Sequence, residues 1–216
     1  AELRRGGLAG RARAKDVIAF ARLPAEEVFP GYSWRERRSS QREQQSGVLC
    51  HSAIEIQSVV GCPFDCAYCP YTSFVCIRLD VENFVERVAR LTRESGQRLF
   101  KLNNRSDTLG LEPEYGLAAA LVERFARIDD KYLMLYAKGD HVAHLCDLDH
   151  RGKTVASFTL TPEPVAELLE TGAPSPERRL AAIAELARAG YPIRVRFSPI
   201  VPLVGWRAAY DELLAR

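Results

Sequence analysis

The stretch from Ile54 to Pro70 reads IEIQSVVGCPFDCAYCP and joins a short apolar segment to a group of cysteines. Its first part, Ile54–Val60, is rich in β-branched residues and partly alternates apolar with polar side chains, which predicts a strand. The next part contains Cys62, Cys66 and Cys69 in the spacing C-x3-C-x2-C, with an aromatic residue just before the last cysteine. Thiolates this close together on one loop can converge on one metal centre. The stretch therefore predicts a metal site directly after a strand.

Two kinds of metal centre fit the cysteine loop. An iron–sulfur cluster is usually held by four cysteines, so three on one loop would leave one iron open to another ligand. The alternative is a structural zinc ion, with Cys50, His51 or Cys76 as its fourth ligand. Zinc sites favour paired C-x2-C segments, and the sequence contains no second pair. The spacing favours the iron–sulfur cluster.

Downstream of the cysteine loop, strand-like and helix-like segments alternate. Amphipathic spacing and capping residues predict helices over Asp80–Ser95, Glu112–Ile128, Ser175–Ala189 and Trp206–Ala215, with a short helix around Asp140–Leu148. Runs of β-branched and aromatic residues predict strands over Arg98–Asn103, Tyr132–Ala137, Thr154–Thr161 and Ile193–Ile200. The helix after Ser175 has the clearest boundaries, because Ser175 can cap it and Gly190 with Pro192 stops it.

This alternation predicts an α/β fold built on a parallel sheet with right-handed crossovers. An open doubly wound sheet and a full or partial β/α barrel both fit the order of elements. In either architecture ligands bind at the carboxyl ends of the strands. The cysteine loop follows the first strand and is therefore expected on that face.

Composition and charge narrow the class of protein. Hydrophobic residues make up 47% and charged residues 27%, ordinary values for a globular domain, and no apolar run approaches ~18 residues. The first residues, 1–15, are rich in arginine and lack the apolar core of a secretory signal, so we expect a cytoplasmic protein without a membrane span. Residues 1–42 contain ten basic and five acidic side chains. We expect residues 1–50 to form a basic arm with short helices, one of them over Arg11–Arg22, ahead of a barrel domain over 51–216. Such an arm could attract a nucleic acid or be a solvated tail.

The loop of three cysteines after the first strand of a β/α repeat resembles that of the radical S-adenosylmethionine superfamily. The resemblance implies a [4Fe–4S] cluster held by Cys62, Cys66 and Cys69, with S-adenosylmethionine bound to the fourth iron. One-electron reduction would then cleave S-adenosylmethionine to methionine and a 5′-deoxyadenosyl radical, which abstracts hydrogen from a substrate. An electron donor of the flavodoxin or ferredoxin type is implied as a partner.

From about Cys62 to the end, the chain resembles the spore photoproduct lyase family more narrowly. The motifs that carry this resemblance, in order, are Phe158-Thr159-Leu160-Thr161, Glu170-Thr171-Gly172, Ser175-Pro176, Ala189-Gly190-Tyr191-Pro192, Ser198-Pro199-Ile200 and Gly205-Trp206. The resemblance implies a partial (β/α)6-type barrel, of which this chain supplies five strands, and a C-terminal portion is expected to be missing. It also implies lyase chemistry in DNA repair, on a thymine photoproduct.

The resemblance implies a set of cofactor contacts. Ser106 would contact the amino group of S-adenosylmethionine with Asp107 beside it, and Lys138 would contact its carboxylate. The remaining cofactor contacts that it implies come from Tyr68, Thr159, Thr161 and Ser198. Thr159 and Thr161 stand where the family has serine and asparagine, so the hydroxyl chemistry is kept but the amide is lost.

The chain departs from the family at the residues of the repair chemistry. The family's hydrogen-donating cysteine lies two positions before the serine of the Ser-Asp pair, which is Asn104 here. An amide cannot replace a thiol as a hydrogen-atom donor. The family's tyrosine after the last cluster cysteine is Pro70 here, although Tyr68 and Tyr71 flank that position. We therefore take Tyr68, Tyr71 and Asn104 as the candidate catalytic residues.

Three functions follow from this comparison of motifs. The first is a radical S-adenosylmethionine enzyme that acts on a DNA photoproduct. The second is a paralogue that performs the same radical chemistry on another substrate. The third, from a different class, is a zinc-stabilised nucleic-acid-binding module.

Overall fold

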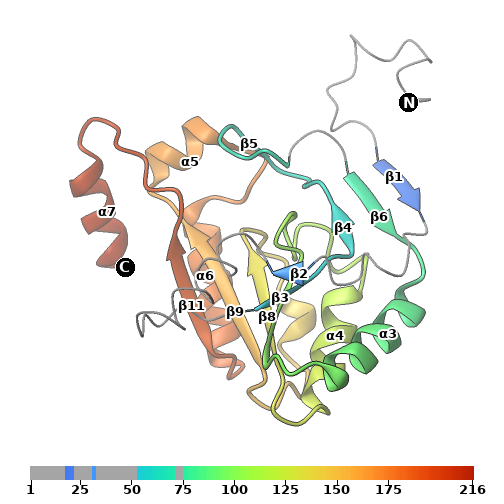
Figure 1. Cartoon of the computed structure of the whole chain (residues 1–216). Helices are drawn as coiled ribbons and strands as arrows, with labels where there is room; N and C mark the ends of the chain where they lie inside the picture. Colours follow the sequence, from blue (N-terminus) through green and yellow to red (C-terminus); the bar gives the residue numbers. More distant parts are fainter. Residues whose placement is uncertain (1–17, 22–30, 33–52, 72–74) are drawn as a thin grey trace, which may run out of the picture.

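The computed structural model describes residues 18–21, 31–32, 53–71 and 75–216. Its centre is a six-stranded sheet with the strand order β11-β9-β8-β7-β3-β2 (Figure 1). The strands are β2 (Gly31–Tyr32), β3 (Ile54–Ile56), β7 (Leu99–Leu102), β8 (Tyr132–Ala137), β9 (Thr154–Leu160) and β11 (Ile193–Phe197).

The sheet is wound in one direction. Its strands β3, β7, β8, β9 and β11 are parallel, and each pairs with the next one along the chain, while β2 is antiparallel to β3 at one edge. A doubly wound sheet would reverse its strand order at a switch point, and this sheet does not. The fold is therefore the wall of a partial β/α barrel, one of the architectures that fit the order of elements and the one that the family resemblance implied. The carboxyl ends of these five strands share one rim.

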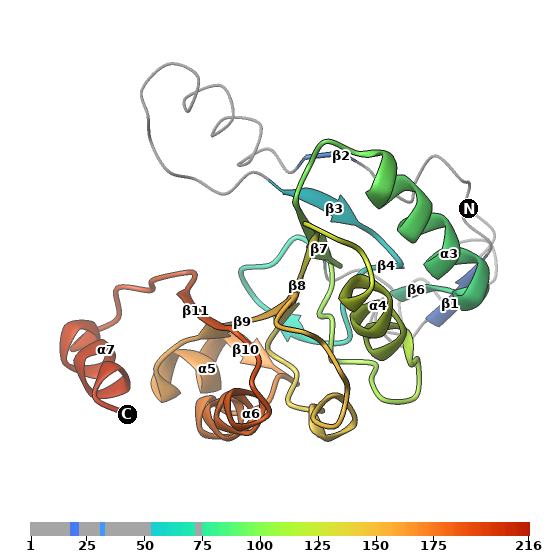
Figure 2. The same cartoon turned by 90° about the horizontal axis from the view of Figure 1, so that it is seen from below.

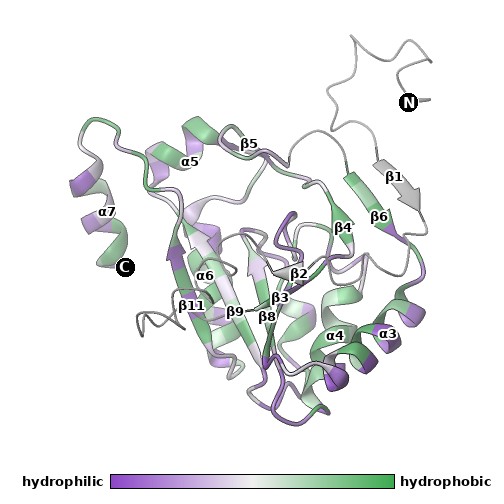
Figure 3. Cartoon of the chain, viewed as in Figure 1, coloured by the Kyte–Doolittle hydropathy of each residue, from purple (hydrophilic) through white to green (hydrophobic). Residues whose placement is uncertain are grey.

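Three helices cover one face of the sheet, namely α3 (Val81–Glu94), α4 (Leu117–Ala126) and α6 (Pro176–Arg188) (Figure 2). The apolar residues of α3 recur at helical spacing, and the hydropathy colouring shows both green and purple stretches along it (Figure 3). Buried side chains such as Phe100, Phe125 and Phe158 fill the space between helices and sheet. Apolar burial at ~25 cal/mol per Å² makes this layer the main source of stability.

The structure confirms four of the predicted helices, those over 80–95, 112–128, 175–189 and 206–215, with shorter ends. The capping hydroxyl of Ser175 accepts the Arg178 N–H at 3.3 Å at the start of α6. Helix α4 begins at Leu117 rather than at Glu112, because Gly116 has a left-handed φ of +67° that a helix cannot include. Helix α7 (Trp206–Leu214) follows β11 as expected, and the helix expected around 140–148 is only a 3-10 turn, Ala143–Leu145.

The expected strand over Ile54–Val60 is wrong as a single element. It divides into β3 and β4 (Val59–Val60), and β4 pairs with β6 (Val75–Arg78) in a second sheet. The cause is Asn103, whose φ is +52°: its side-chain oxygen accepts the N–H groups of Ser58 at 2.9 Å and Val59 at 3.3 Å. These bonds replace ladder bonds and turn the chain out of the sheet.

The expected helix over Arg11–Arg22 is wrong where the structure describes it. Residues Ile18–Ala21 form β1, which runs parallel to β6. The rest of that segment lies outside the described residues, as does most of the predicted arm over 1–50. The boundary of the arm therefore stays a prediction.

Several short elements were not predicted from the sequence. Helix α5 (Glu163–Leu169) follows β9, and β10 (Glu170–Thr171) pairs antiparallel with β5 (Asp65–Cys66) within the cysteine loop. This two-residue ladder attaches the cysteine loop to a segment about a hundred positions later in the chain. None of the helices in the described part of the chain has the length and apolar character that a bilayer crossing requires.

Candidate active site

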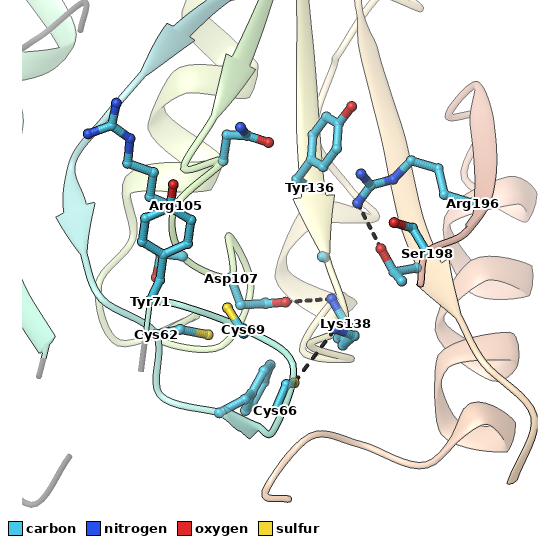
Figure 4. A pocket seen from close by; sticks show the side chains of 15 residues that line it. Cys62, Cys66, Cys69, Tyr71, Arg105, Asp107, Tyr136, Lys138, Arg196 and Ser198 are labelled. Carbon is cyan, nitrogen blue, oxygen red and sulfur yellow. Dashed lines mark hydrogen bonds between the residues drawn. The ribbon is translucent and has the colours of Figure 1, made fainter. Parts of the chain in front are cut away.

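One pocket gathers most of the predicted site residues at the carboxyl ends of the parallel strands (Figure 4). Its walls come from the cysteine loop, the segment after β7, the end of β8 and strands β9 and β11. The lining residues are Cys62, Phe64, Cys66, Cys69, Tyr71, Asn104, Arg105, Ser106, Asp107, Tyr136, Ala137, Lys138, Thr159, Arg196 and Ser198. Parallel strands bring these side chains together because their ends meet at one rim.

The cysteine loop is held by backbone hydrogen bonds. Cys66 pairs with Glu170 in the short β5–β10 ladder, and the Ala67 N–H donates to the Leu169 carbonyl at 2.8 Å. The Cys69 N–H donates to the Cys66 carbonyl at 2.9 Å, which folds the loop back on itself. The loop thereby places all three cysteines at one side of the pocket (Figure 4).

Burial raises the pKa values of two of the three thiols, Cys62 and Cys66. Burial, followed by the nearby Asp107 carboxylate, raises the pKa of Cys62 to about 12. Burial also raises the pKa of Cys66, although Lys138 opposes it. Because a cysteine binds a metal as its thiolate, a metal that binds here must displace the protons of these thiols.

The described residues do not form a complete ligand set for a single metal ion such as zinc. In the part of the chain that the structure describes, no group of three or more His, Cys, Asp or Glu side chains is arranged to hold one metal ion. The cysteines of an iron–sulfur cluster bind different irons and therefore stand further apart than the ligands of one zinc ion. Cys76 lies in β6 opposite Val60 and does not line the pocket, while Cys50 and His51 lie outside the described residues.

Asp107 ties the end of β7 to the end of β8. Its buried carboxylate accepts the backbone N–H groups of Leu109 at 2.9 Å, of Gly139 at 3.2 Å and of Lys138. Burial raises the pKa of Asp107, against the lowering effect of these N–H donors. A side chain at Gly139 would come within 2.8 Å of the Asp107 carboxylate and of the Leu109 backbone, so the close approach of these segments requires glycine. Asp107 thus shapes the pocket with its carboxylate bound to backbone.

Ser106, next to Asp107, presents an unsatisfied hydroxyl. Its Oγ is buried and has no hydrogen-bond partner among the described residues, although Ser106 lines the pocket. A buried hydroxyl without a partner costs about 1–3 kcal/mol, so such a group points to a ligand that completes its bonding.

Lys138 and Tyr68 form a hydrogen-bonded group with Cys66 and Glu170. The Lys138 ammonium donates to the Tyr68 hydroxyl at 2.7 Å and to the Cys66 sulfur at 3.6 Å, and lies 3.5 Å from Glu170 Oε1. The Tyr68 hydroxyl donates to the same Glu170 oxygen. Burial and Glu170 raise the pKa of Tyr68. Burial would raise the pKa of Glu170 as well, but Lys138 and Arg179 outweigh it and hold that pKa below its ordinary value.

The sequence did not predict the opposite wall of the pocket. The Arg196 guanidinium stacks 3.7 Å from the centre of the Tyr136 ring and donates to the Thr159 hydroxyl at 2.7 Å. Arginine alternates with apolar residues in β11 (IRVRF), and that pattern alone does not tell which face meets a pocket. On the other side, Arg105 lines the pocket beside Asn104.

Asn104 is hydrogen-bonded to a buried acid. Its side-chain amide donates to Glu55 Oε1 at 2.6 Å, and the Arg105 guanidinium lies 3.7 Å from the other Glu55 oxygen. Glu55 is only 2% exposed. Asn104 therefore presents a positioned amide at the pocket wall.

The predicted site residues divide into two groups by position. Tyr71, Asn104, Ser106, Asp107, Lys138, Thr159 and Ser198 line the pocket with the three cysteines. Tyr68 and Thr161 do not. Tyr68 turns its hydroxyl to Glu170 instead, and Thr161 is fully buried with no hydrogen-bond partner for its hydroxyl among the described residues. Cys76 and Cys146, the other thiols of the described chain, also lie away from the pocket, and Cys146 contacts Glu185.

A family model and two curated relatives show the family of this chain. The family model described as spore photoproduct lyase matches residues 46–216. The spore photoproduct lyase of Bacillus subtilis (strain 168) is 26% identical over 169 residues, covering 74% of this chain and 49% of the relative. That of Geobacillus sp. (strain Y412MC61) is 30% identical over 173 residues, covering 73% of this chain and 49% of the relative.

A solved structure agrees with these matches. A double mutant of spore photoproduct lyase with bound AdoMet and dinucleoside spore photoproduct superposes with a TM-score of 0.70 at 25% identity, covering 80% of this chain and 54% of that one. The chain spans about half the length of the curated relatives it matches.

Proposed function

Because this chain belongs to the spore photoproduct lyase family, we propose that it is a radical S-adenosylmethionine enzyme that acts on a photoproduct in DNA. One observation carries the proposal: three cysteine thiols line one pocket with Lys138 and with the unsatisfied hydroxyl of Ser106. This donor set matches a cluster with an open iron and an amino acid bound beside it. The DNA substrate, the electron donor of flavodoxin or ferredoxin type and a cytoplasmic location are parts of the same proposal.

The residues present fit both cofactors. Cys62, Cys66 and Cys69 would hold the [4Fe–4S] cluster, and Ser106 would accept or donate a hydrogen bond at the amino group of S-adenosylmethionine. Together the two cofactors supply one-electron cleavage of a sulfonium and hence hydrogen abstraction from a bound substrate. Ser198 and Thr159 line the side of the pocket towards β9 and β11, where the rest of the cofactor would lie.

The chain's own residues would position these groups. Lys138 would form a charge-assisted hydrogen bond with the S-adenosylmethionine carboxylate, and Tyr68 and Glu170 keep its ammonium near Cys66. Asp107 keeps the backbone of Lys138 close to Ser106. The two residues that would contact the amino acid part of the cofactor thus share one rigid support.

Replacing Lys138 by methionine is expected to weaken S-adenosylmethionine binding about tenfold or more, because a hydrogen bond between charged groups contributes about 1.5–3 kcal/mol. Binding to the reconstituted protein would be measured by titration calorimetry. Lys153→Met is the matched control, since its ammonium binds the Ile128 carbonyl at 2.6 Å outside the pocket. An unchanged dissociation constant in Lys138→Met would contradict the assignment.

Two arginines that line the pocket suit an anionic substrate. Arg105 and Arg196 come to the same pocket from different strands' ends, and Tyr136 offers a ring face that Arg196 already covers. Guanidinium groups bind phosphate oxygens well. These residues support a nucleic-acid substrate.

One observation favours the second candidate, the same radical chemistry on a different substrate. The family's hydrogen donor position is Asn104 here, and the structure binds its amide to Glu55 at 2.6 Å. The Asn104 side chain is therefore bound to Glu55 and contains no thiol hydrogen that could be transferred to a substrate radical. A substrate whose reaction needs no thiol donor would suit this wall.

Asn104→Cys is expected to increase the yield of thymine dinucleoside from dinucleoside spore photoproduct, because it places a thiol where the family has its donor. Product yield would be measured by liquid chromatography under anaerobic turnover. Asn104→Ala is the control, since it also releases Glu55 but adds no thiol. Equal yields from the cysteine and alanine variants would count against the alignment of this position.

The proposed function is tested by turnover of the reconstituted protein with dithionite, S-adenosylmethionine and dinucleoside spore photoproduct. We expect 5′-deoxyadenosine to form, and its rate to rise when the photoproduct is added. Formation of 5′-deoxyadenosine without photoproduct reversal would favour the second candidate. A colourless protein that binds one zinc ion and cleaves no S-adenosylmethionine would contradict both.

A further inference from the structure

Next to the pocket residue Lys138 lies a fully buried ion pair, formed by Glu170 of β10 and Arg179 of α6, with side-chain exposures of 0% each. Neither residue lines the pocket. Given the proposed function, we propose that Glu170 and Arg179 are positioning residues, which hold the cysteine loop and Lys138 in register with the strand that bears Thr159.

Arg179 connects three segments with one guanidinium. Its Nε donates to the Pro174 carbonyl at 2.8 Å, its Nη1 to the Thr159 carbonyl at 3.1 Å and its Nη2 to Glu170 Oε2 at 2.5 Å. The Thr159 side chain lines the pocket, so the bond from Arg179 to the Thr159 carbonyl holds the backbone of a residue that would contact the cofactor. The planar fork of arginine suits such a three-way contact, and lysine cannot reproduce it.

Glu170 contacts the cysteine loop in two ways, through its backbone and through its side chain. Its backbone pairs with that of Cys66, and its Oε1 accepts from the Tyr68 hydroxyl and lies 3.5 Å from the Lys138 ammonium. One carboxylate oxygen therefore contacts Arg179 and the other contacts the loop. A shift of Glu170 would move Cys66 and Lys138 together.

Stability alone does not explain a charged pair at this position. Removing two charges from water costs several kcal/mol per ion, and apolar residues of similar volume often serve a core as well or better. The ion pair instead fixes the relative positions of several segments around the pocket, because each of its hydrogen bonds ends on a different one. Residues that hydrogen-bond to metal ligands from behind orient them in the same way. The loss of such a residue typically costs about 10–100-fold in metal affinity or activity.

The pair also sets the charge beside the cysteines. Two cations, Lys138 and Arg179, share the single carboxylate of Glu170, and Lys138 lies 3.6 Å from the Cys66 sulfur. If Glu170 loses its negative charge, the potential at a cluster on Cys66 becomes more positive, and the reduced cluster is favoured. A residue with a merely structural role would not shift the cluster's reduction potential in this direction.

The test compares two glutamates that are both buried. Glu170→Gln keeps the shape of the side chain and removes its charge. Its matched control is Glu112→Gln, since Glu112 is 1% exposed, accepts the Ala118 N–H at 3.0 Å and lies away from the pocket. Each variant would be reconstituted, its iron counted, its S-adenosylmethionine dissociation constant titrated and its cluster potential measured by redox titration followed by electron paramagnetic resonance.

We expect Glu170→Gln to bind a full complement of iron, to weaken S-adenosylmethionine binding about tenfold and to raise the reduction potential. We expect Glu112→Gln to lower the melting temperature without moving either quantity. Arg179→Lys provides a second route if Glu170→Gln misfolds. It keeps the charge but loses the fork, so S-adenosylmethionine binding should weaken while the potential stays near that of the unmodified protein.

The failures of the inference and of the proposed function are distinguishable. An unmodified protein that assembles no cluster or binds no S-adenosylmethionine overturns the proposed function, and the inference with it. An unmodified protein that binds both overturns the inference alone if Glu170→Gln matches it in affinity and in potential. Equal changes in Glu112→Gln would show a general effect of destabilisation and would likewise overturn the inference.

Discussion

Replacing Cys66 by alanine is expected to abolish both the iron–sulfur cluster and the cleavage of S-adenosylmethionine. Cys66 is the middle cysteine of the loop, accepts a hydrogen bond from the Lys138 ammonium at 3.6 Å and pairs with β10. A cluster left with two protein thiols on one short loop would lack the ligands to hold it. Iron and sulfide content after anaerobic reconstitution, together with 5′-deoxyadenosine formation, would measure the loss.

Cys76→Ala is the matched control for this experiment. Cys76 lies in β6, opposite Val60, and does not line the pocket. The control variant should therefore keep its iron and its activity. If Cys66→Ala retained a full iron complement, or if Cys76→Ala lost it, the assignment of the ligands would be wrong.

Asp107→Ala is expected to reduce the free energy of unfolding by about 3 kcal/mol or more, since each buried N–H left without its acceptor costs about 1–3 kcal/mol. The donors that lose their acceptor are those of Leu109, Lys138 and Gly139. Because the bonds from Lys138 and Gly139 join the ends of β7 and β8, the variant should also lose most of its S-adenosylmethionine binding. Urea unfolding of the protein without cofactors isolates the first effect from the second.

Asp129→Ala is the control for Asp107→Ala. The Asp129 side chain is fully exposed and lies 3.6 Å from Lys153, and such surface ion pairs contribute about 0–1 kcal/mol. A loss of stability in Asp107→Ala no greater than that of the control would show that the carboxylate does not tie the two strands together.

Local patterns in the sequence were enough to predict the frame of this protein. The apolar spacing of Val81–Glu94 and the caps of Pro176–Arg188 are properties of neighbouring residues, so their helices were predictable. The strand Tyr132–Ala137 was predicted to the residue. The order of strands and helices then implied a parallel sheet, and its rim placed the cysteine loop on the ligand side.

The contacts that the sequence did not reveal join residues far apart in the chain. Asn103 interrupts the first predicted strand by capturing Ser58, 45 positions away, and the Tyr68 hydroxyl binds Glu170 from 102 positions away. Nothing near Tyr68 in the sequence indicates that its hydroxyl binds Glu170. Arg179 looks like one more arginine on a charged helix, and only the fold shows that it is fully buried.

The central claim is that the three cysteines leave one iron of a four-iron cluster open to S-adenosylmethionine. Mössbauer spectroscopy of protein reconstituted with 57Fe tests it most directly, because it resolves the individual irons. We expect a [4Fe–4S] spectrum in which the signal of one iron site shifts when S-adenosylmethionine is added and the other three do not. A spectrum that S-adenosylmethionine leaves unchanged, or protein that takes up zinc but no iron, would contradict the account.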